Sequence, residues 1–148
     1  MEYKNFDIDF IERTLSIIQQ YDELHLDNRK YEVTLMINSL LGIIVFPKEK
    51  NISYIPNDKI NESLNESIGL TQSDINPKIK TVKELINKLR NSISHFDFET
   101  KSNTITSEIE KIIFYDKNIY VADFHIKELK LFIEYIASNT INNIKLYK

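Results

Sequence analysis

The chain lacks most of the residues on which small stapled or metal-bound proteins depend. Its 148 residues include no cysteine, no tryptophan, only two glycines and three prolines. Without cysteine it can form no disulfide framework, zinc ribbon, thiol nucleophile or thiolate-held iron–sulfur cluster. Two glycines are too few for a glycine-rich phosphate loop, and no His-Glu-x-x-His run or metal-ligand spacing of acidic residues is present. The sequence therefore predicts neither a metal nor another cofactor.

Long apolar runs and a strong excess of one charge are also absent. The longest apolar stretch, residues 35–46, is interrupted by Asn38 and Ser39 and is shorter than the roughly 18–20 residues of a membrane-spanning helix. The net charge of −3 provides no global basic field, so binding to a polyanion would need a local cluster of Lys and Arg. The N-terminal segment MEYKNFDIDF has no basic or apolar signal region, and we expect a cytoplasmic protein.

The residues that are present predict one globular domain, residues 1–148, of the mainly α class. The composition is 42% hydrophobic and 28% charged, which excludes a disordered or low-complexity chain. Apolar residues recur at steps of three and four, which predicts helices over 6–26, from the N-cap candidates Asp27 and Asn28 to Pro47, over 77–96, and from Asp123 onward. Gly42 is expected to be a close-packing point.

The regions between these helices are expected to differ from one another. Residues 48–76 predict an irregular polar connection with a short helix near 58–67. After residue 97 the period shifts toward two, which predicts a small β excursion with turns at 102–103 and 116–118.

Two of the predicted helices have a distinct buried stripe. The 77–96 helix should begin at the Asn76-Pro77 pair. Its stripe comprises Ile79, Val82, Ile86, Leu89, Ile93 and Phe96, and that of the last helix comprises Leu129, Phe132, Ile133 and Ile136.

Of the three histidines, His95 is the best candidate for a functional group. His25 lies at the end of the first helix, and His125 is expected to be a half-buried structural residue on the apolar side of the last helix. His95 instead points away from the stripe of its helix, one turn after Asn91, while Arg90 lies at the margin of the polar face. The helix would thus present a guanidinium, an amide and an imidazole, although a solvated polar face is the alternative.

Two observations favour a site over a solvated face. With three arginines and three histidines in the chain, an Arg followed five residues later by a His is expected only about 0.06 times by chance. The same segment is locally basic, which suits a surface that follows phosphates but also suits ordinary solubility charge. Its charged residues are Lys78, Lys80, Lys83, Lys88 and Arg90, against Glu84 alone.

The motif Arg90-Asn91-Ser92-Ile93-Ser94-His95 resembles the R-x4-6-H signature of HEPN domains (higher eukaryotes and prokaryotes nucleotide-binding), in its R-N-x-x-x-H form. Residues 38–49 are similar to the second helix of a small plasmid- and mobile-element-associated HEPN branch. The order of helices agrees over nearly the whole chain. The resemblance implies a HEPN-like up-and-down helical bundle with a small β-hairpin after the motif helix.

The resemblance also implies a metal-independent endoribonuclease that acts as a homodimer, with its two motif helices facing each other. Many relatives are toxins or act in antiviral defence. His95 would serve in general acid/base catalysis on the 2′-hydroxyl, Arg90 would clamp the phosphate, and Asn91 would position His95 or a phosphate oxygen. RNA-binding candidates are Lys80, Lys83, Lys88 and Ser94. The expected partners are RNA, a second copy of the chain, and an antitoxin or regulatory protein.

Two other classes of function stay open at this point. A catalytically inactive HEPN-type module could bind RNA or regulate a partner protein, and a structural oligomerisation domain would need only the polar helix face as an interface. Asp97 and Glu99 beside the motif carry negative charge that opposes an approaching RNA.

Overall fold

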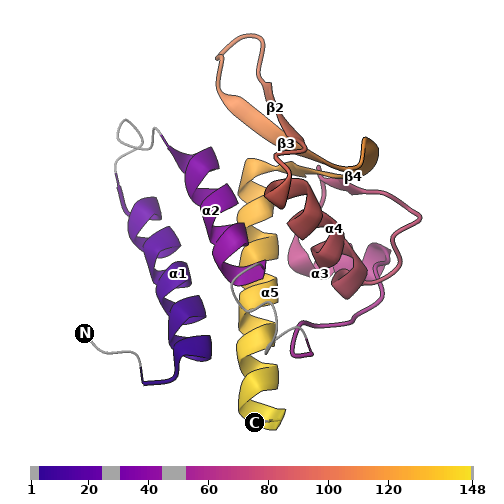
Figure 1. The fold of residues 1–148 in the computed structure, drawn as a ribbon. Helices are drawn as coiled ribbons and strands as arrows, with labels where there is room; N and C mark the ends of the chain where they lie inside the picture. Colours follow the sequence, from indigo (N-terminus) through magenta and orange to yellow (C-terminus); the bar gives the residue numbers. More distant parts are fainter. Residues whose placement is uncertain (1–3, 25–30, 45–52, 148) are drawn as a thin grey trace. The chain divides into compact units, whose positions relative to one another are not determined.

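The computed structural model describes residues 4–24, 31–44 and 53–147 (Figure 1). The chain forms two compact units. The first unit is Met1–Pro56 with Ile133–Lys148, and the second is Asn57–Phe132. The described elements are α1 (Phe6–Asp22), α2 (Glu32–Ile44), α3 (Glu62–Ile68), β1 (Asp74–Ile75), α4 (Val82–Ser94), β2 (Phe98–Ser102), β3 (Ile109–Asp116), β4 (Ile119–His125) and α5 (Ile126–Tyr147). The predicted class, mainly α with a β excursion, is confirmed.

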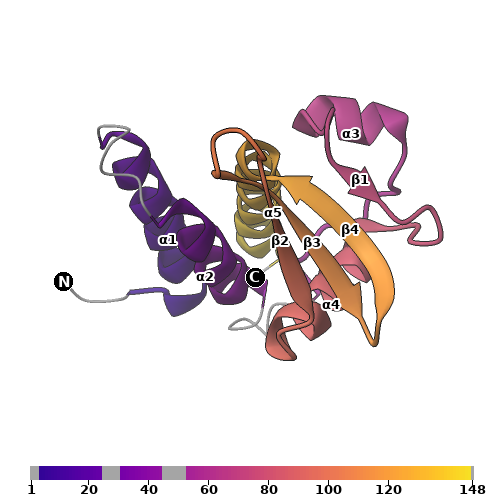
Figure 2. The same ribbon diagram turned by 90° about the horizontal axis from the view of Figure 1, so that it is seen from above.

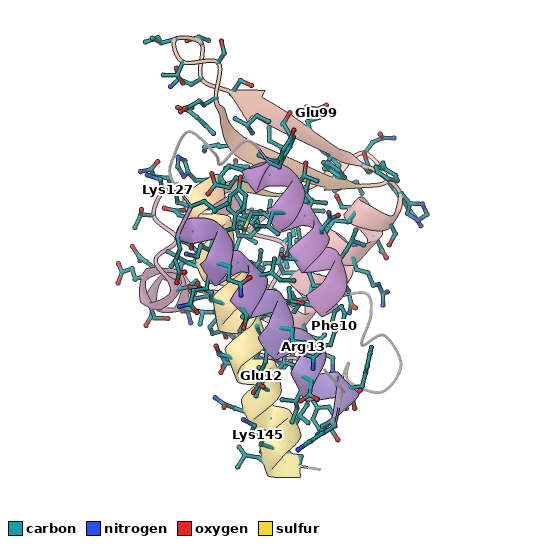
Figure 3. The ribbon with its side chains drawn as sticks, turned by 90° about the vertical axis from the view of Figure 1, so that its left-hand side faces the viewer. Phe10, Glu12, Arg13, Glu99, Lys127 and Lys145 are labelled. Atoms are coloured by element: carbon teal, nitrogen blue, oxygen red, sulfur yellow. The ribbon has the colours of Figure 1, made fainter. Side chains whose placement is uncertain are left out.

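In the first unit α1 packs against α2, and Gly42 of α2 lies close to Phe10 and Thr14 of α1. A Cβ at Gly42 would lie 3.1 Å from the ring of Phe10, so the predicted close-packing role is confirmed. In the same unit Lys145 Nζ of α5 lies 3.7 Å from Glu12 Oε1 of α1 (Figure 3), an exposed ion pair of the kind that contributes little to stability.

The predicted limits of the first two helices fall mostly outside the described residues. The first helix ends at Asp22 rather than at residue 26. His25, the N-cap candidates Asp27 and Asn28, and Pro47 are not among the described residues. No helix in the described part of the chain is both long enough and apolar enough to cross a membrane.

The second unit contains a four-stranded antiparallel sheet in the order β1-β4-β3-β2 (Figure 2). The predicted β excursion is confirmed, and β1 adds a strand in the segment predicted to be irregular. Lys117 and Asn118, with φ of 52° and 62°, form the two-residue β3–β4 turn, where positive φ at both positions matches the twist of the paired strands. Helix α4 packs against β3 and β4.

The predicted start of the motif helix at residue 77 is wrong, because α4 begins at Val82. Asn76 is held by the sheet, where its backbone N–H donates to the Val121 carbonyl and its amide donates to the Tyr120 carbonyl. Residues 76–79 form a turn instead of helix, closed by the bond from the Ile79 N–H to the Asn76 carbonyl. Thr81 is the N-cap instead, and its hydroxyl accepts from the backbone N–H of Glu84 at 3.2 Å.

The prediction that Asp123 caps the last helix is also wrong. Asp123 lies within β4, opposite Ile113 of β3, and its carboxylate accepts hydrogen bonds from Lys111 and Tyr120. His125 is the last residue of β4, half-buried, rather than a residue on a helix face. The predicted stripe of α5 is buried throughout, as expected of Leu129, Phe132, Ile133 and Ile136.

Candidate functional site

The motif occupies the C-terminal end of α4 and the turn that follows it. The helix buries one face, which comprises Val82, Leu85, Ile86, Leu89, Ser92 and Ile93. Arg90 and Asn91 are half-buried, whereas Ser94 and His95 are exposed. The predicted orientation of His95, away from the core, is confirmed.

A Schellman-type turn ends α4. The N–H of Phe96 donates to the Ile93 carbonyl and that of Asp97 donates to the Ser92 carbonyl, which satisfies two of the last helical carbonyls. The buried Ser92 hydroxyl adds a bond of 2.8 Å to the carbonyl of Asp97. The chain is therefore turned sharply into β2 immediately after His95, and the histidine is left at the exposed end of the helix.

This turn places Phe96 in the left-handed region, with a φ of 54°. The sequence pattern counted Phe96 as part of the buried stripe, and that prediction is wrong, because the side chain is 83% exposed. The reason is that the helix ends two residues earlier, so the helical period no longer decides which way Phe96 points.

The end of α4 and the β3–β4 turn together line a hollow of about 350 Å³. Its residues are Asn91, His95, Phe96, Asp97, Asp116, Lys117 and Asn118. Asp97 joins the two sides of the hollow, because its backbone carbonyl accepts from Tyr115 N–H at 2.9 Å and its carboxylate accepts from Asn118 N–H at 3.3 Å.

Asp116 is the buried charge of this site. Its carboxylate is 6% exposed and accepts from Lys88 Nζ at 2.8 Å and, more weakly, from the Asn91 amide at 3.5 Å. The hydrogen bond from Lys88 outweighs burial and holds the pKa of Asp116 below its ordinary value. Asn91 thus turns its amide nitrogen toward Asp116.

The structure brings together some of the predicted site residues and not others. Asn91 and His95 line the same hollow, but Arg90 does not. No cluster of three or more His, Asp or Glu side chains suited to a metal ion occurs within residues 4–24, 31–44 and 53–147.

The basic residues predicted to lie on the motif helix are not all part of α4. Lys78 and Lys80 precede α4, and the Lys80 ammonium donates to the Pro77 carbonyl at 2.6 Å. Lys83 is half-buried on α4, and Lys88 is paired with Asp116.

Sequence reasoning missed the half of the hollow that comes from the β3–β4 turn. The sequence predicts a turn at residues 116–118. The contact that brings this turn to α4 joins Lys88 and Asp116, which are 28 residues apart in the chain. No local pattern in the sequence reports a pairing of that range. The positive φ of Phe96 likewise comes from the turn that ends α4, so the helical period of the sequence does not predict it.

Comparison of the whole chain with known families agrees with the motif. A family model described as HEPN pEK499 p136 matches residues 1–146. The chain belongs to this HEPN family. The family is plasmid-associated, and HEPN domains are commonly ribonucleases. No curated protein and no solved structure matches the HEPN chain.

Proposed function

We propose that this HEPN chain is a metal-independent endoribonuclease. The 2′-oxygen of a ribose attacks the adjacent phosphorus, the bond from phosphorus to the 5′-oxygen breaks, and a 2′,3′-cyclic phosphate remains. The observation that carries the proposal is the R-N-x-x-x-H motif at the end of α4, with His95 exposed at the rim of a polar hollow. The family's usual activity supports it.

His95 has the access and the chemistry for proton transfer. An imidazole has one nitrogen that can accept a proton and one that can donate it, so it can accept the proton of the 2′-hydroxyl or supply one to the departing 5′-oxygen. Its side chain is exposed to a substrate, while its backbone N–H is fixed by a bond of 3.1 Å to the Asn91 carbonyl. Asn91 and Ser94 offer further donors beside it.

Arg90 would stabilise the charge that develops on the phosphate, because its planar guanidinium presents paired donors. Five residues turn an α-helix by about 140° beyond a full turn, so Arg90 and His95 of one chain point in different directions. A homodimer in which two α4 helices face each other would supply a second Arg90 and a second His95 to one cleft. We therefore place the working site between two copies of the chain.

RNA binding would depend on the lysines before and within α4. Lys80 is exposed and Lys83 half-buried. Lys88 already neutralises Asp116 and has less charge to offer a phosphate. An RNA that reaches His95 from the N-terminal end of α4 would contact Lys80 and Lys83.

The test is incubation of purified protein with mixed RNA in EDTA. His95→Ala should lower the cleavage rate by a factor of about 10²–10⁴, the usual contribution of a positioned acid or base. Arg90→Lys should also lose activity, because lysine lacks the planar guanidinium with its paired donors. His125→Ala, which removes the other histidine of the described chain, is the matched control and should keep its activity. Products should carry cyclic phosphates.

Two results would overturn the proposal. One is a folded His95→Ala protein that cuts RNA at the wild-type rate, and the other is wild-type cleavage that stops when EDTA is added. Because His95 is exposed, its truncation should change the free energy of unfolding by no more than about 0.5 kcal/mol. Urea unfolding followed by circular dichroism measures this change.

The plasmid association of the family favours a toxin or phage-defence role, with an antitoxin or regulatory protein as partner. Expression of the wild type should then slow growth, and expression of the His95→Ala variant should not.

A second candidate function is a catalytically inactive HEPN module that binds RNA or regulates a partner protein. Two carboxylates, Asp97 and Asp116, line the hollow and would repel a phosphate placed beside His95 for cleavage, which favours a module without catalytic activity. RNA binding without cleavage in the same experiment would support it.

A further inference from the structure

Phe96 combines two properties that each act against stability. Its φ of 54° belongs to the left-handed region, where glycine is normal at this position of the turn and a bulky side chain is strained. Its ring is 83% exposed, so little apolar burial offsets the strain. Of the non-glycine residues with positive φ in the described chain, Phe96 is the one apolar residue, the others being Ser107, Lys117 and Asn118.

The Phe96 ring is nevertheless supported from behind. Its centroid lies 6.2 Å from that of Phe98, which in turn lies 6.1 Å from that of the buried Phe114. Phe114 continues the series to Phe124 at 6.2 Å. The exposed ring is thus the outer end of a row of aromatic side chains that is anchored in the core of the second unit.

The surroundings of the ring are polar. Phe96 is the one apolar residue among the seven that line the hollow, and His95 precedes it directly. The core of a protein–protein interface is depleted in charged residues, whereas the residues that line the hollow together with Phe96 are all polar or charged. A flat aromatic group with polar edges fits this setting better than an apolar protein surface.

Resting on the proposed function, we propose that Phe96 is a stacking platform for a nucleobase of single-stranded RNA next to the phosphate at which His95 transfers a proton. Base–aromatic stacking is worth about 1–3 kcal/mol per base and accepts any base, because every base has a π-face. The strained turn aims the ring outward beside His95. Polar groups of the hollow are then available to the edges of the base.

The experiment measures binding of single-stranded RNA oligonucleotides by fluorescence anisotropy in EDTA, in a His95→Ala background that prevents cleavage. Phe96→Leu should weaken binding about 5- to 150-fold, which is the stacking energy expressed as a ratio of dissociation constants. Phe96→Tyr should stay within a few-fold of the parent. Tyr147→Leu, which removes another exposed aromatic ring, is the matched control and should have no effect.

An abasic residue introduced at each position of the oligonucleotide in turn locates the stacked base. At one position the abasic residue should weaken binding to the parent by the same factor as Phe96→Leu does. With the abasic residue at that position, Phe96→Leu should cause no further loss of RNA affinity. If the abasic residue weakens binding to the Phe96→Leu protein by the same factor as binding to the parent, at every position, then the ring does not stack on a base.

Phe96→Gly and Phe96→Leu both lack the ring, but only glycine relieves the backbone strain. The glycine variant should melt about 2–4 °C higher than the leucine variant. A lower melting temperature for glycine would refute the strain on which the argument depends, whether or not the protein binds RNA.

The outcomes separate the two proposals. Wild-type cleavage with equal RNA affinity of Phe96→Leu and its parent overturns stacking alone. Phe96-dependent RNA binding without wild-type cleavage supports stacking and overturns the ribonuclease proposal. Absence of RNA binding overturns stacking, and conversion of a dimer to a monomer by Phe96→Leu assigns the ring to a second copy instead.

Discussion

Glu128 in the first turn of α5 allows a pH-dependent contribution to stability to be predicted with a magnitude. Its carboxylate, 7% exposed, accepts hydrogen bonds from three backbone N–H groups and two hydroxyls of residues 71–73. The shortest is the bond of 2.6 Å from the Ser73 hydroxyl. Burial by itself raises the pKa of Glu128, but these bonds outweigh burial and lower the pKa to about 2, from an ordinary 4.5.

Glu128→Gln keeps the shape of the side chain and removes its charge. A pKa lowered by this amount corresponds to about 3 kcal/mol of folding free energy at neutral pH. Because the folded-state pKa lies below the unfolded value, the contribution is complete above pH 4.5 and is lost as the pH falls toward 2. The variant should therefore be less stable than the wild type by about 3 kcal/mol at pH 7, and less than half of that difference should remain at pH 3.

Urea unfolding followed by circular dichroism at pH 7, 5, 4 and 3 measures this difference directly. Glu66→Gln, which neutralises an exposed carboxylate of α3, is the control and should change the free energy of unfolding by no more than about 0.5 kcal/mol. A difference between wild type and Glu128→Gln that keeps the same size from pH 7 to pH 3 would refute the reasoning. So would a difference below about 1 kcal/mol at pH 7.

Three further predictions concern assembly and RNA binding. Light scattering at micromolar concentration should give the mass of a homodimer, and a monomeric mass would contradict the two-fold site. RNA affinity should fall as salt rises, and a Lys80→Ala, Lys83→Ala double variant should flatten the log–log slope, whereas an unchanged slope would point to another surface. Asp116→Asn leaves Lys88 with an uncompensated charge, so the slope should steepen by about one, and weaker binding by the folded variant would contradict this.

The sequence predicted the features that depend on local periodicity. The interior of α4, the paired strands after it and the stripe of α5 follow repeats of 3.6 or 2 residues, because each of these elements buries one face. The limits of these elements were harder to predict. Asn76-Pro77 and Asp123 both have good capping chemistry, but each is held by the sheet, and those contacts come from distant parts of the chain.

The candidate site divides in the same way. Asn91 and His95 are four residues apart, so helical geometry alone predicts that they lie together, and they line one hollow. The turn at residues 116–118 was predicted, but its approach to these two residues could not be, since its contact with α4 joins residues 28 apart. Arg90 shows the limit of local reasoning, because its place in the motif predicts a shared site, yet within one chain it does not line the hollow of His95.

The acidic residues near the motif have a different role from the one that their charge alone predicts. The Asp97 carboxylate accepts from the backbone of Asn118, and that of Asp116 accepts from Lys88. Each carboxylate thus has an internal donor and ties the β3–β4 turn to the end of α4. Because Lys88 offsets the charge of Asp116, the negative charge that faces an approaching RNA is smaller than a count of Asp and Glu suggests. Both residues also line the hollow beside His95, so the same residues that oppose RNA by charge form part of the wall of the site.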